Sequence, residues 1–330
     1  MSDAATPVPH DGTAHDGRAD ACPPASPARR GREYWGMRLL GGLPDPALAV
    51  LARRAQRPTK PARSVVPRRL VTRERIAGAG DTSPEVPVTW IDRRRARTAT
   101  IVHLHGGAYL AAESPMHWRW LEELRRRAGT AAAMIQYRMP PSSPAPAAVD
   151  DALAAIRALQ RRADLRDGAW VLSGDSAGGG IALAVVQAMR DADEPLPAGL
   201  LLTSPWTDLT LSDPTIPARA TRDVVLDVRS LRRAADEYAG VLGPRDPRVS
   251  PRFGSVDGLP PVLLVAGEHE ALQPDAQHLA DDLRAAGTPV VSIEIPGGRH
   301  DHPVLADDPA AQWVIRRQIA FVREACGLRA

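Results

Sequence analysis

The chain has little of what a disulfide-rich, zinc-binding or membrane-spanning protein needs. Only two of its 330 residues are cysteines, Cys22 and Cys326, one near each end. Two cysteines so placed build neither a disulfide framework nor a zinc site, and no metal or organic cofactor is expected. No apolar run approaches the roughly 20 residues of a membrane-spanning helix. We therefore expect no integral membrane span.

Charge of one sign is also scarce. The formal net charge is +3, and aromatic residues make up 4% of the chain. The arginine runs at 93–95 and 125–127 stand close to acidic residues, which is typical of solvated faces rather than of a stripe that binds nucleic acid. We expect no nucleic-acid partner.

The length and the amino-terminal composition predict one folded domain behind a tail. A chain of 330 residues with 44% hydrophobic content can bury the core of a single α/β domain. The first thirty residues lack the apolar stretch of about 7 to 15 residues that a secretory signal needs. We predict a disordered tail over residues 1–32, a folded domain over 33–330, and a cytoplasmic protein.

One pentapeptide predicts a catalytic serine. Gly174-Asp175-Ser176-Ala177-Gly178 follows an apolar run and precedes a helical pattern. A turn this tight between a strand and a helix holds the serine at strained backbone angles, which the flanking glycines allow. The geometry lifts the hydroxyl above the sheet, at the positive end of the helix. We predict that Ser176 is the nucleophile.

A second motif predicts the oxyanion hole. The apolar run 99–104 reads as a buried strand and ends in His105-Gly106-Gly107-Ala108-Tyr109. Acyl transfer places negative charge on the substrate carbonyl oxygen, and preorganised backbone N–H groups stabilise that charge best. We assign the donors to Gly107, Ala108 and Ala177, with Gly106 as the reserve.

Two alternatives exist for this segment: His105 could be a second base, or it could be a zinc ligand together with His103. Alternate residues of a strand point to opposite faces, and no cysteine or third histidine follows at ligand spacing. We therefore expect both histidines to be structural.

These motifs and those after them resemble the hormone-sensitive-lipase-like branch of the α/β-hydrolase family, the bacterial family IV short-chain esterases and acetyl-hydrolases. The resemblance covers about residues 85 to 326. Its later motifs are Tyr137-Arg138, residues 146–151, Ser204-Pro205-Trp206-Thr207-Asp208, residues 246–251 and Gly258-Leu259-Pro260-Pro261. The chain departs from the family pattern at Ala108, where a third glycine is usual, and at Pro140-Pro141-Ser142, where the usual Ala-Pro-Glu carries a carboxylate.

The orienting acid is expected in the loop after an apolar run at 262–266, because this fold orders its triad as serine, acid, histidine. Three carboxylates compete there: Glu268, Glu270 and Asp275. The resemblance places the family's acid at Glu270, with Glu268 next. Asp275 looks like a carboxylate at the start of a helix.

The general base is expected in the loop after the last predicted strand. That loop carries His300, which would accept the serine proton on one ring nitrogen while Glu270 holds the other. His302 is the neighbouring alternative. Relatives carry a bulky residue at that position, so we predict a packing role for His302. The remaining histidines, at positions 10, 15, 117, 269 and 278, have no motif context.

Alternating patterns predict a doubly wound, mostly parallel sheet. Strands are predicted near 87–91, 99–104, 131–136, 169–173, 198–203, 261–266 and 290–295, and helices near 115–128, 146–162, 177–191, 275–286 and 308–325. The resemblance adds the α/β-hydrolase fold and a helical cap. We expect cap segments near 33–60 and 212–240.

The resemblance implies a serine carboxylesterase that hydrolyses short-chain acyl esters through an acyl-enzyme. A dedicated acetyl-hydrolase (deacetylase) acting on a biosynthetic intermediate is the alternative, and residues alone do not separate the two. A non-catalytic small-molecule receptor is a third possibility, against which His300 argues. The expected partner is a small-molecule ester, and relatives suggest a homodimer.

Overall fold

The computed structural model describes residues 21–27, 50, 54–78 and 83–329. Of the predicted tail, residues 1–20 and 28–32 lie outside the described residues. Of the predicted cap segment 33–60, residues 33–49 and 51–53 lie outside them as well.

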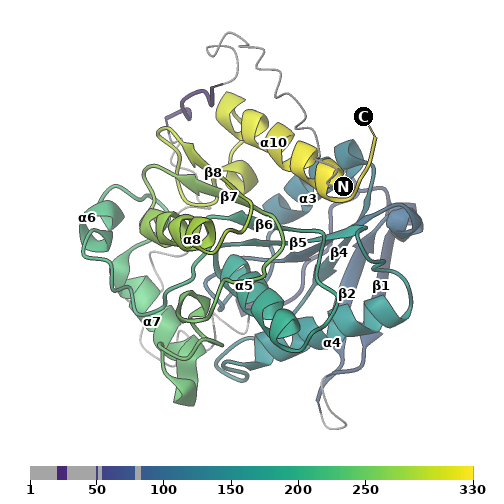
Figure 1. The fold of residues 1–330 in the computed structure, drawn as a ribbon, viewed down its shortest axis with the longest axis horizontal. Helices are drawn as coiled ribbons and strands as arrows, with labels where there is room; N and C mark the ends of the chain where they lie inside the picture. Colours follow the sequence, from purple (N-terminus) through teal and green to yellow (C-terminus); the bar gives the residue numbers. More distant parts are fainter. Residues whose placement is uncertain (1–20, 28–49, 51–53, 79–82, 330) are drawn as a thin grey trace, which may run out of the picture.

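The described strands form one mixed sheet in the order β1-β2-β4-β3-β5-β6-β7-β8 (Figure 1). β2 pairs antiparallel with β1 and β4, and the other neighbours are parallel. The predicted doubly wound, mostly parallel sheet is thus confirmed. The strands are β1 (Val71–Ile76), β2 (Val86–Ile91), β3 (Thr100–Leu104), β4 (Ala131–Ile135), β5 (Trp170–Asp175), β6 (Gly199–Thr203), β7 (Val262–Gly267) and β8 (Val290–Ile295).

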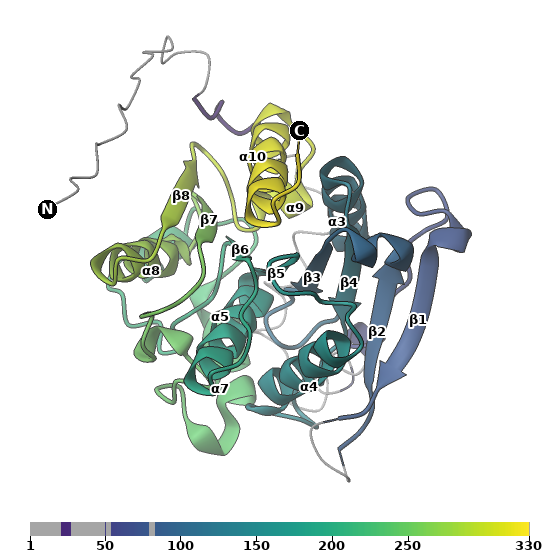
Figure 2. The same cartoon turned by 45° about the vertical axis from the view of Figure 1, so that its right-hand side comes forward.

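Helices cover both faces of the sheet (Figure 2). One hydrophobic cluster joins the sheet to α3, α9 and α10, and the other joins it to α4, α5, α7 and α8. The α-helices are α3 (Pro115–Ala128), α4 (Ala147–Arg161), α5 (Ser176–Asp191), α6 (Ile216–Ala220), α7 (Val228–Ala239), α8 (Gln273–Ala285), α9 (His302–Leu305) and α10 (Pro309–Ala325). Short 3-10 helices are η2 (Arg68–Leu70), η3 (Arg93–Arg97), η4 (Gly240–Leu242) and η5 (Pro251–Phe253).

Burial explains why the sequence revealed strands β3 to β7. Every residue of β3 to β7 is buried, and strands covered on both faces read as continuous apolar runs. β1 was not predicted. It lies at the edge of the sheet, and its residues Arg73, Glu74 and Arg75 break the apolar pattern because only Ile76 of this strand is buried.

Local capping explains where α3 begins and ends. The side chain of Ser114 accepts the N–H of Met116, and His117 returns a contact to the Ser114 N–H at 3.0 Å. Gly129 closes the helix with φ 82°, a backbone conformation that glycine adopts without a steric penalty. The helix therefore spans the predicted 115–128, and it places Nε2 of His117 3.0 Å from Oδ2 of Asp175 at the end of β5.

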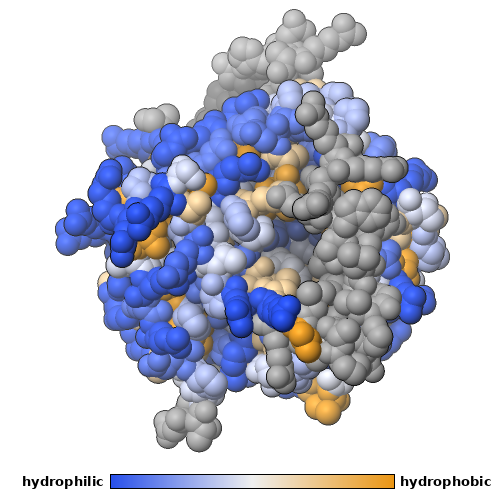
Figure 3. Space-filling view, turned by 180° about the vertical axis from the view of Figure 1, so that it is seen from behind, coloured by the Kyte–Doolittle hydropathy of each residue, from blue (hydrophilic) through white to orange (hydrophobic). Residues whose placement is uncertain are grey.

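Hydrophobic residues on the face shown in Figure 3 form small separate groups within a mostly hydrophilic surface. The large hydrophobic side chains described as exposed come from separate segments: Val50, Val241, Phe253 and Val291. No helix in the described part of the chain is both long and apolar enough to cross a bilayer.

The loops that carry the predicted site all leave the carboxyl ends of parallel strands. β3 leads into residues 105–109, β5 into Ser176, β7 into residues 268–271 and β8 into residues 296–302. Parallel strands end at one edge of the sheet, so these loops meet there. That edge is the candidate site.

Candidate active site

Ser176 lies at a strained turn between β5 and α5. Its φ is 50°, a conformation rarely taken by residues other than glycine. Space explains the glycines around it. A Cβ atom on Gly174 would lie 2.3 Å from the carbonyl oxygen of Gly178, and one on Gly178 would lie 2.1 Å from that of Leu104. The turn can close only because both positions lack a side chain.

The structure brings the predicted nucleophile, base and acid together. Nε2 of His300 lies 2.8 Å from Oγ of Ser176. Nδ1 of His300 lies 3.5 Å from Oε2 of Glu270. All three side chains are buried, and Glu270 is fully so. The ring therefore bridges a hydroxyl and a carboxylate through its two nitrogens, which is the geometry of a serine hydrolase triad.

Burial and neighbouring groups act in opposite directions on the pKa values of Glu270 and His300. Burial raises the pKa of Glu270, while its contacts with His300 and Ser204 oppose the shift. Burial lowers the pKa of His300, but the neighbouring Asp301 and Glu270 side chains, when both are ionised, outweigh it and raise that pKa to about 10.

Two side chains hold the acid loop in place. Oγ of Ser204, at the end of β6, donates to Oε2 of Glu270 at 2.6 Å and accepts the N–H of Asp301 at 3.0 Å. Asp223, between α6 and α7, accepts the N–H of Ala271 at 2.8 Å. The loops that follow β6, β7 and β8 are thus linked through buried hydrogen bonds.

The competing carboxylates and His302 have other partners. Glu268 is half exposed and accepts the N–H of Gly297 at 2.7 Å. Asp275 lies in the first turn of α8, where it accepts the N–H groups of Thr207 and Asp208 at 2.8 and 2.9 Å. His302 contacts Asp308, the residue that caps α10, at 3.1 Å. None of these contacts reaches Ser176 or His300.

The predicted oxyanion loop has the left-handed backbone that would expose its N–H groups. Its φ values are 126° at Gly107 and 50° at Ala108. Among the described residues, no hydrogen-bond partner is found for either N–H group. Ala177 lies in the first turn of α5, where backbone N–H groups have no partner within the helix. The N–H of Gly106 instead donates to Oδ1 of Asp175 at 2.9 Å, so Gly106 is already engaged.

A buried cluster of titratable side chains lies beneath this loop. Asp175 is fully buried, with Nε2 of His103 3.0 Å from its Oδ1 and Nε2 of His117 3.0 Å from its Oδ2. Burial alone would raise the pKa of Asp175, but the charge of His117 lowers it well below its usual value. Burial lowers the pKa of His117, and the Asp175 charge reverses that shift and raises it. Asp175 and His117 therefore each favour the charged form of the other.

His103 and His105 are both held by protein contacts. Burial lowers the pKa of each, to about 3 for His105. His105 stacks on Tyr137 with the ring centres 4.4 Å apart, and its Nδ1 lies 2.8 Å from the carbonyl oxygen of Gly106. A search of the described residues finds no group of three or more His, Cys, Asp or Glu side chains placed to hold a metal ion.

Sequence reasoning missed several residues that the fold brings to this site. Ser204 was noted only as part of a motif, His117 was treated as an ordinary histidine, and Asp223 and Asp301 were not considered. Each reaches the site through tertiary contacts rather than through local spacing. For Asp301 the available signal was its position directly after His300.

Both predicted cap segments contact the oxyanion loop or the residues just after it. Tyr238 of α7 stacks on Tyr109, with the ring centres 3.7 Å apart. In the other predicted cap segment, the carbonyl oxygen of Ala55 accepts the N–H of Ala112, which lies just after the oxyanion loop, at 3.0 Å. The N–H of Thr59 donates to Glu113 at 2.8 Å.

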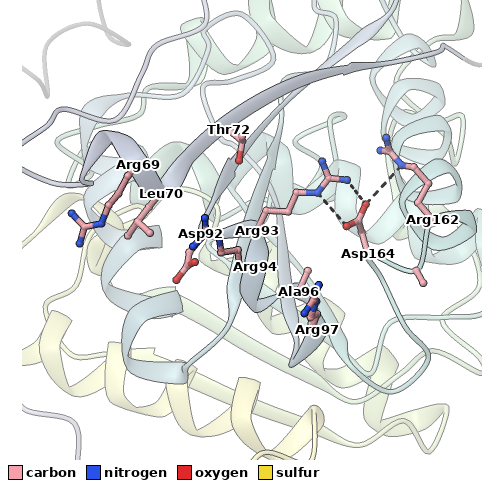
Figure 4. Close-up of a pocket in the computed structure, with 11 residues that line it drawn as sticks. Arg69, Leu70, Thr72, Asp92, Arg93, Arg94, Ala96, Arg97, Arg162 and Asp164 are labelled. Atoms are coloured by element: carbon pink, nitrogen blue, oxygen red, sulfur yellow. Dashed lines mark hydrogen bonds and ion pairs between the residues drawn. The ribbon is translucent and has the colours of Figure 1, made fainter.

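A cavity of about 600 Å³ lies at the opposite edge of the sheet, where η3 leads into β3 (Figure 4). Arg93 and Arg162 both contact Asp164, at 2.7 and 3.7 Å. Asp164 therefore compensates part of the positive charge that lines this cavity. The cavity lies at the amino end of β3. Because β3 and β5 are parallel and Ser176 follows the carboxyl end of β5, the cavity and Ser176 lie at opposite ends of these strands. The cavity is lined by residues 69, 70, 72, 92–94, 96, 97 and 162–164.

Comparison with known proteins gives the same picture. A family model described as an alpha/beta hydrolase fold matches residues 101–303, a range that contains all of the predicted site residues. An acetyl-hydrolase from Streptomyces hygroscopicus is 40% identical over 72% of this chain and 80% of its own length. An esterase from Acinetobacter venetianus is 31% identical over 61% of this chain and 66% of its own length.

Solved structures extend the similarity over most of the chain. An esterase of the bacterial hormone-sensitive lipase family superimposes with a TM-score of 0.72 at 28% identity, covering 86% of this chain and all of that one.

Proposed function

This chain belongs to the alpha/beta hydrolase family, and we propose that it is a serine carboxylesterase that hydrolyses short-chain acyl esters through Ser176, His300 and Glu270. Its esterase and lipase relatives show that the protein is a carboxylic ester hydrolase. The assignment of these three residues rests on the contact of His300 with both Ser176 and Glu270.

Acylation begins with attack of Ser176 Oγ on the ester carbonyl carbon. His300 takes the serine proton on Nε2, while Glu270 holds Nδ1 and stabilises the imidazolium that forms. His300 then gives its proton to the leaving alcohol, and the acyl group remains on Ser176. The 2.8 Å contact between Nε2 and Oγ supports this proton transfer.

Negative charge on the substrate oxygen is stabilised by the N–H groups of Gly107, Ala108 and Ala177. Preorganised donors of this kind contribute about 10²–10³-fold each to kcat. The engagement of Gly106 by Asp175 supports the assignment to its two successors. Water activated by His300 then attacks the acyl-enzyme in the same site and releases the acid.

The preference for short acyl chains rests on a cap. We assign the cap to the segments near 33–60 and 212–240, which would cover the pocket and limit the length of the acyl group. The stack of Tyr238 on Tyr109 supports this assignment, because Tyr109 is the last residue of the oxyanion loop. The contact of Ala55 with Ala112 supports it from the other segment.

The test is hydrolysis of p-nitrophenyl esters from acetate to dodecanoate by wild type, Ser176→Ala and the control Ser255→Ala. Ser255 is an exposed serine outside the site. We expect turnover to be fastest with the short chains and to fall about 10⁴-fold or more in Ser176→Ala only. Unchanged turnover by Ser176→Ala would refute the assigned nucleophile.

A dedicated acetyl-hydrolase is the second candidate, favoured by the 40% identity to the Streptomyces acetyl-hydrolase. Acetylated amines and acetate esters, compared as substrates of one preparation, separate the two functions. Activity confined to acetyl groups, and greater on the amide than on the ester, would favour the acetyl-hydrolase. Activity that continues to butyrate and hexanoate esters would favour the general esterase.

A further inference from the structure

Asp301 places a second carboxyl group against the predicted base. Its Oδ2 lies 3.3 Å from Nε2 of His300, the same nitrogen that contacts Ser176. Its backbone is left-handed, with φ 52°, and its N–H is bound by Ser204. The side chain is buried, and no hydrogen-bond donor is found for Oδ1 among the described residues. A buried oxygen without a donor suggests that this carboxyl group itself carries a proton.

The neighbour that can accept this proton is Asp175. The carboxyl group of Asp175 is close enough that its charge and a hydrogen bond with it both raise the pKa of Asp301. Two ionised carboxylates in contact repel strongly, so one of them keeps its proton. Asp175 has the contacts that favour the charged form: the N–H of Gly106 and the side chains of His117 and His103. The shared proton therefore belongs on Asp301.

We propose that Asp301 is a positioning residue that acts as a neutral carboxylic acid, with its proton donated to Asp175 and its other oxygen turned to Nε2 of His300. This inference rests on the proposed function. It joins the loop of the base to the oxyanion loop through one buried proton, because Asp175 also holds the N–H of Gly106.

The electrostatics of the base require the neutral form. Beside an ionised Asp301, the pKa of His300 would be raised to about 10, and the ring could not accept the serine proton at neutral pH. Burial raises the pKa of Asp301 well above its usual value, against the charge of His300 and with the help of Asp175 and Glu270. A protonated Asp301 carries no charge, and its effect on His300 disappears.

The remaining titratable groups around this carboxyl group come from several elements. Glu270 faces His300 from the loop after β7, and Asp223 contributes a further negative charge from the segment between α6 and α7. On the other side, His103 of β3 and His117 of α3 face Asp175.

Two variants test the proposal through the pH profile of kcat/KM, whose acidic limb reports the pKa of the free base. Asp301→Asn keeps a neutral side chain of the same shape, with an NH2 group as donor and a carbonyl oxygen as acceptor. Asp301→Gly removes the side chain and relaxes the left-handed backbone. We expect the acidic limb of Asp301→Asn to stay within a few tenths of a pH unit of wild type.

The rates give a second criterion. Asp301→Gly should lose about 10- to 100-fold in kcat with little change in KM, and Asp301→Asn should recover most of that loss. A shift of the acidic limb in Asp301→Asn by about one unit or more to lower pH would show that Asp301 is ionised in wild type, which overturns the proposal.

An infrared difference spectrum separates this inference from the proposed function. At neutral pH, wild type minus Asp301→Asn should contain the C=O stretch of a protonated carboxylic acid, and ¹³C-labelled aspartate should shift it. A carboxylate pair of bands in its place would overturn the proposal. Because this readout needs no turnover, it decides the state of Asp301 even if every ester tested is inert.

Discussion

Ser204 donates a hydrogen bond of 2.6 Å to Oε2 of Glu270, the oxygen that lies 3.5 Å from Nδ1 of His300. The same hydroxyl oxygen accepts the N–H of Asp301 at 3.0 Å. A single side chain therefore orients the predicted acid and fixes the residue that follows the predicted base. Ser204 itself has φ 45°, so its backbone is in the left-handed region.

Removing this hydroxyl should slow turnover without weakening substrate binding. We expect Ser204→Ala to lower kcat about 10- to 100-fold with KM nearly unchanged, because a hydrogen bond to a charged group contributes about 1.5–3 kcal/mol. Steady-state kinetics on a short-chain ester measure this. Ser204→Gly is the control for the strained backbone. Recovery of wild-type kcat by Gly but not Ala would mean that backbone strain, and not the hydroxyl, is responsible.

The choice between the two glutamates of the acid loop can be tested by a matched pair of variants. Glu270→Gln should lower kcat by about 10³–10⁴-fold, because a neutral amide neither fixes the tautomer of His300 nor stabilises its charge. Glu268→Gln should change kcat less than about threefold, since this half-exposed side chain contacts the Gly297 N–H and not His300. The reverse pattern would make Glu268 the acid.

The sequence predicted those parts of the molecule whose patterns are local. The strands β3 to β7 and the turn at Ser176 were found because continuous apolar runs and a glycine-flanked serine are visible within a few residues. β1 was missed because it lies at the sheet edge, where its charged residues are largely in contact with solvent and break the apolar pattern. Three residues were missed because their partners are far away in the sequence. Ser204 is 66 positions from Glu270, and Asp175 is 126 positions from Asp301 and 58 from His117.

Gly178 should be intolerant of any side chain. A Cβ atom there would meet the carbonyl oxygens of Leu104 and His105 at 2.1 and 2.5 Å, and backbone atoms cannot rotate aside. We expect Gly178→Ala to lower the free energy of unfolding by about 1–3 kcal/mol and to reduce kcat, because the oxyanion loop must shift. Chemical denaturation and ester kinetics measure the two effects.

Gly254→Ala is the matched control for this substitution. Its Cβ would meet the far end of the Gln187 side chain at 2.9 Å, which can move. We expect a smaller loss of stability and unchanged kcat. Equal losses in the two variants would contradict the argument from backbone contact.

The contact of Asp175 with His117 should make stability depend on pH in a defined window. The pKa of His117 is raised above the usual value of about 6.5 for histidine, so its contribution is complete below about pH 6.5 and is lost as pH rises through the raised value. The pKa of Asp175 is lowered below 3.8, so its contribution is complete above about pH 4 and is lost as pH falls through the lowered value. The pair therefore stabilises the fold most between these limits.

His117→Asn tests that window. Near pH 6 the variant should be less stable than wild type by about 3 kcal/mol, because removal of one partner leaves the other charge buried and unpaired. The difference should shrink as pH rises through the raised pKa of His117, where wild type loses the same charge. Asp227→Ala is the control, since it removes the cap of α7 and leaves the contact of His117 with Asp175. Its loss of stability should be nearly constant over the same range. A stability difference for His117→Asn that grew with pH would show that His117 is neutral in the fold and that Asp175 obtains its charge compensation elsewhere.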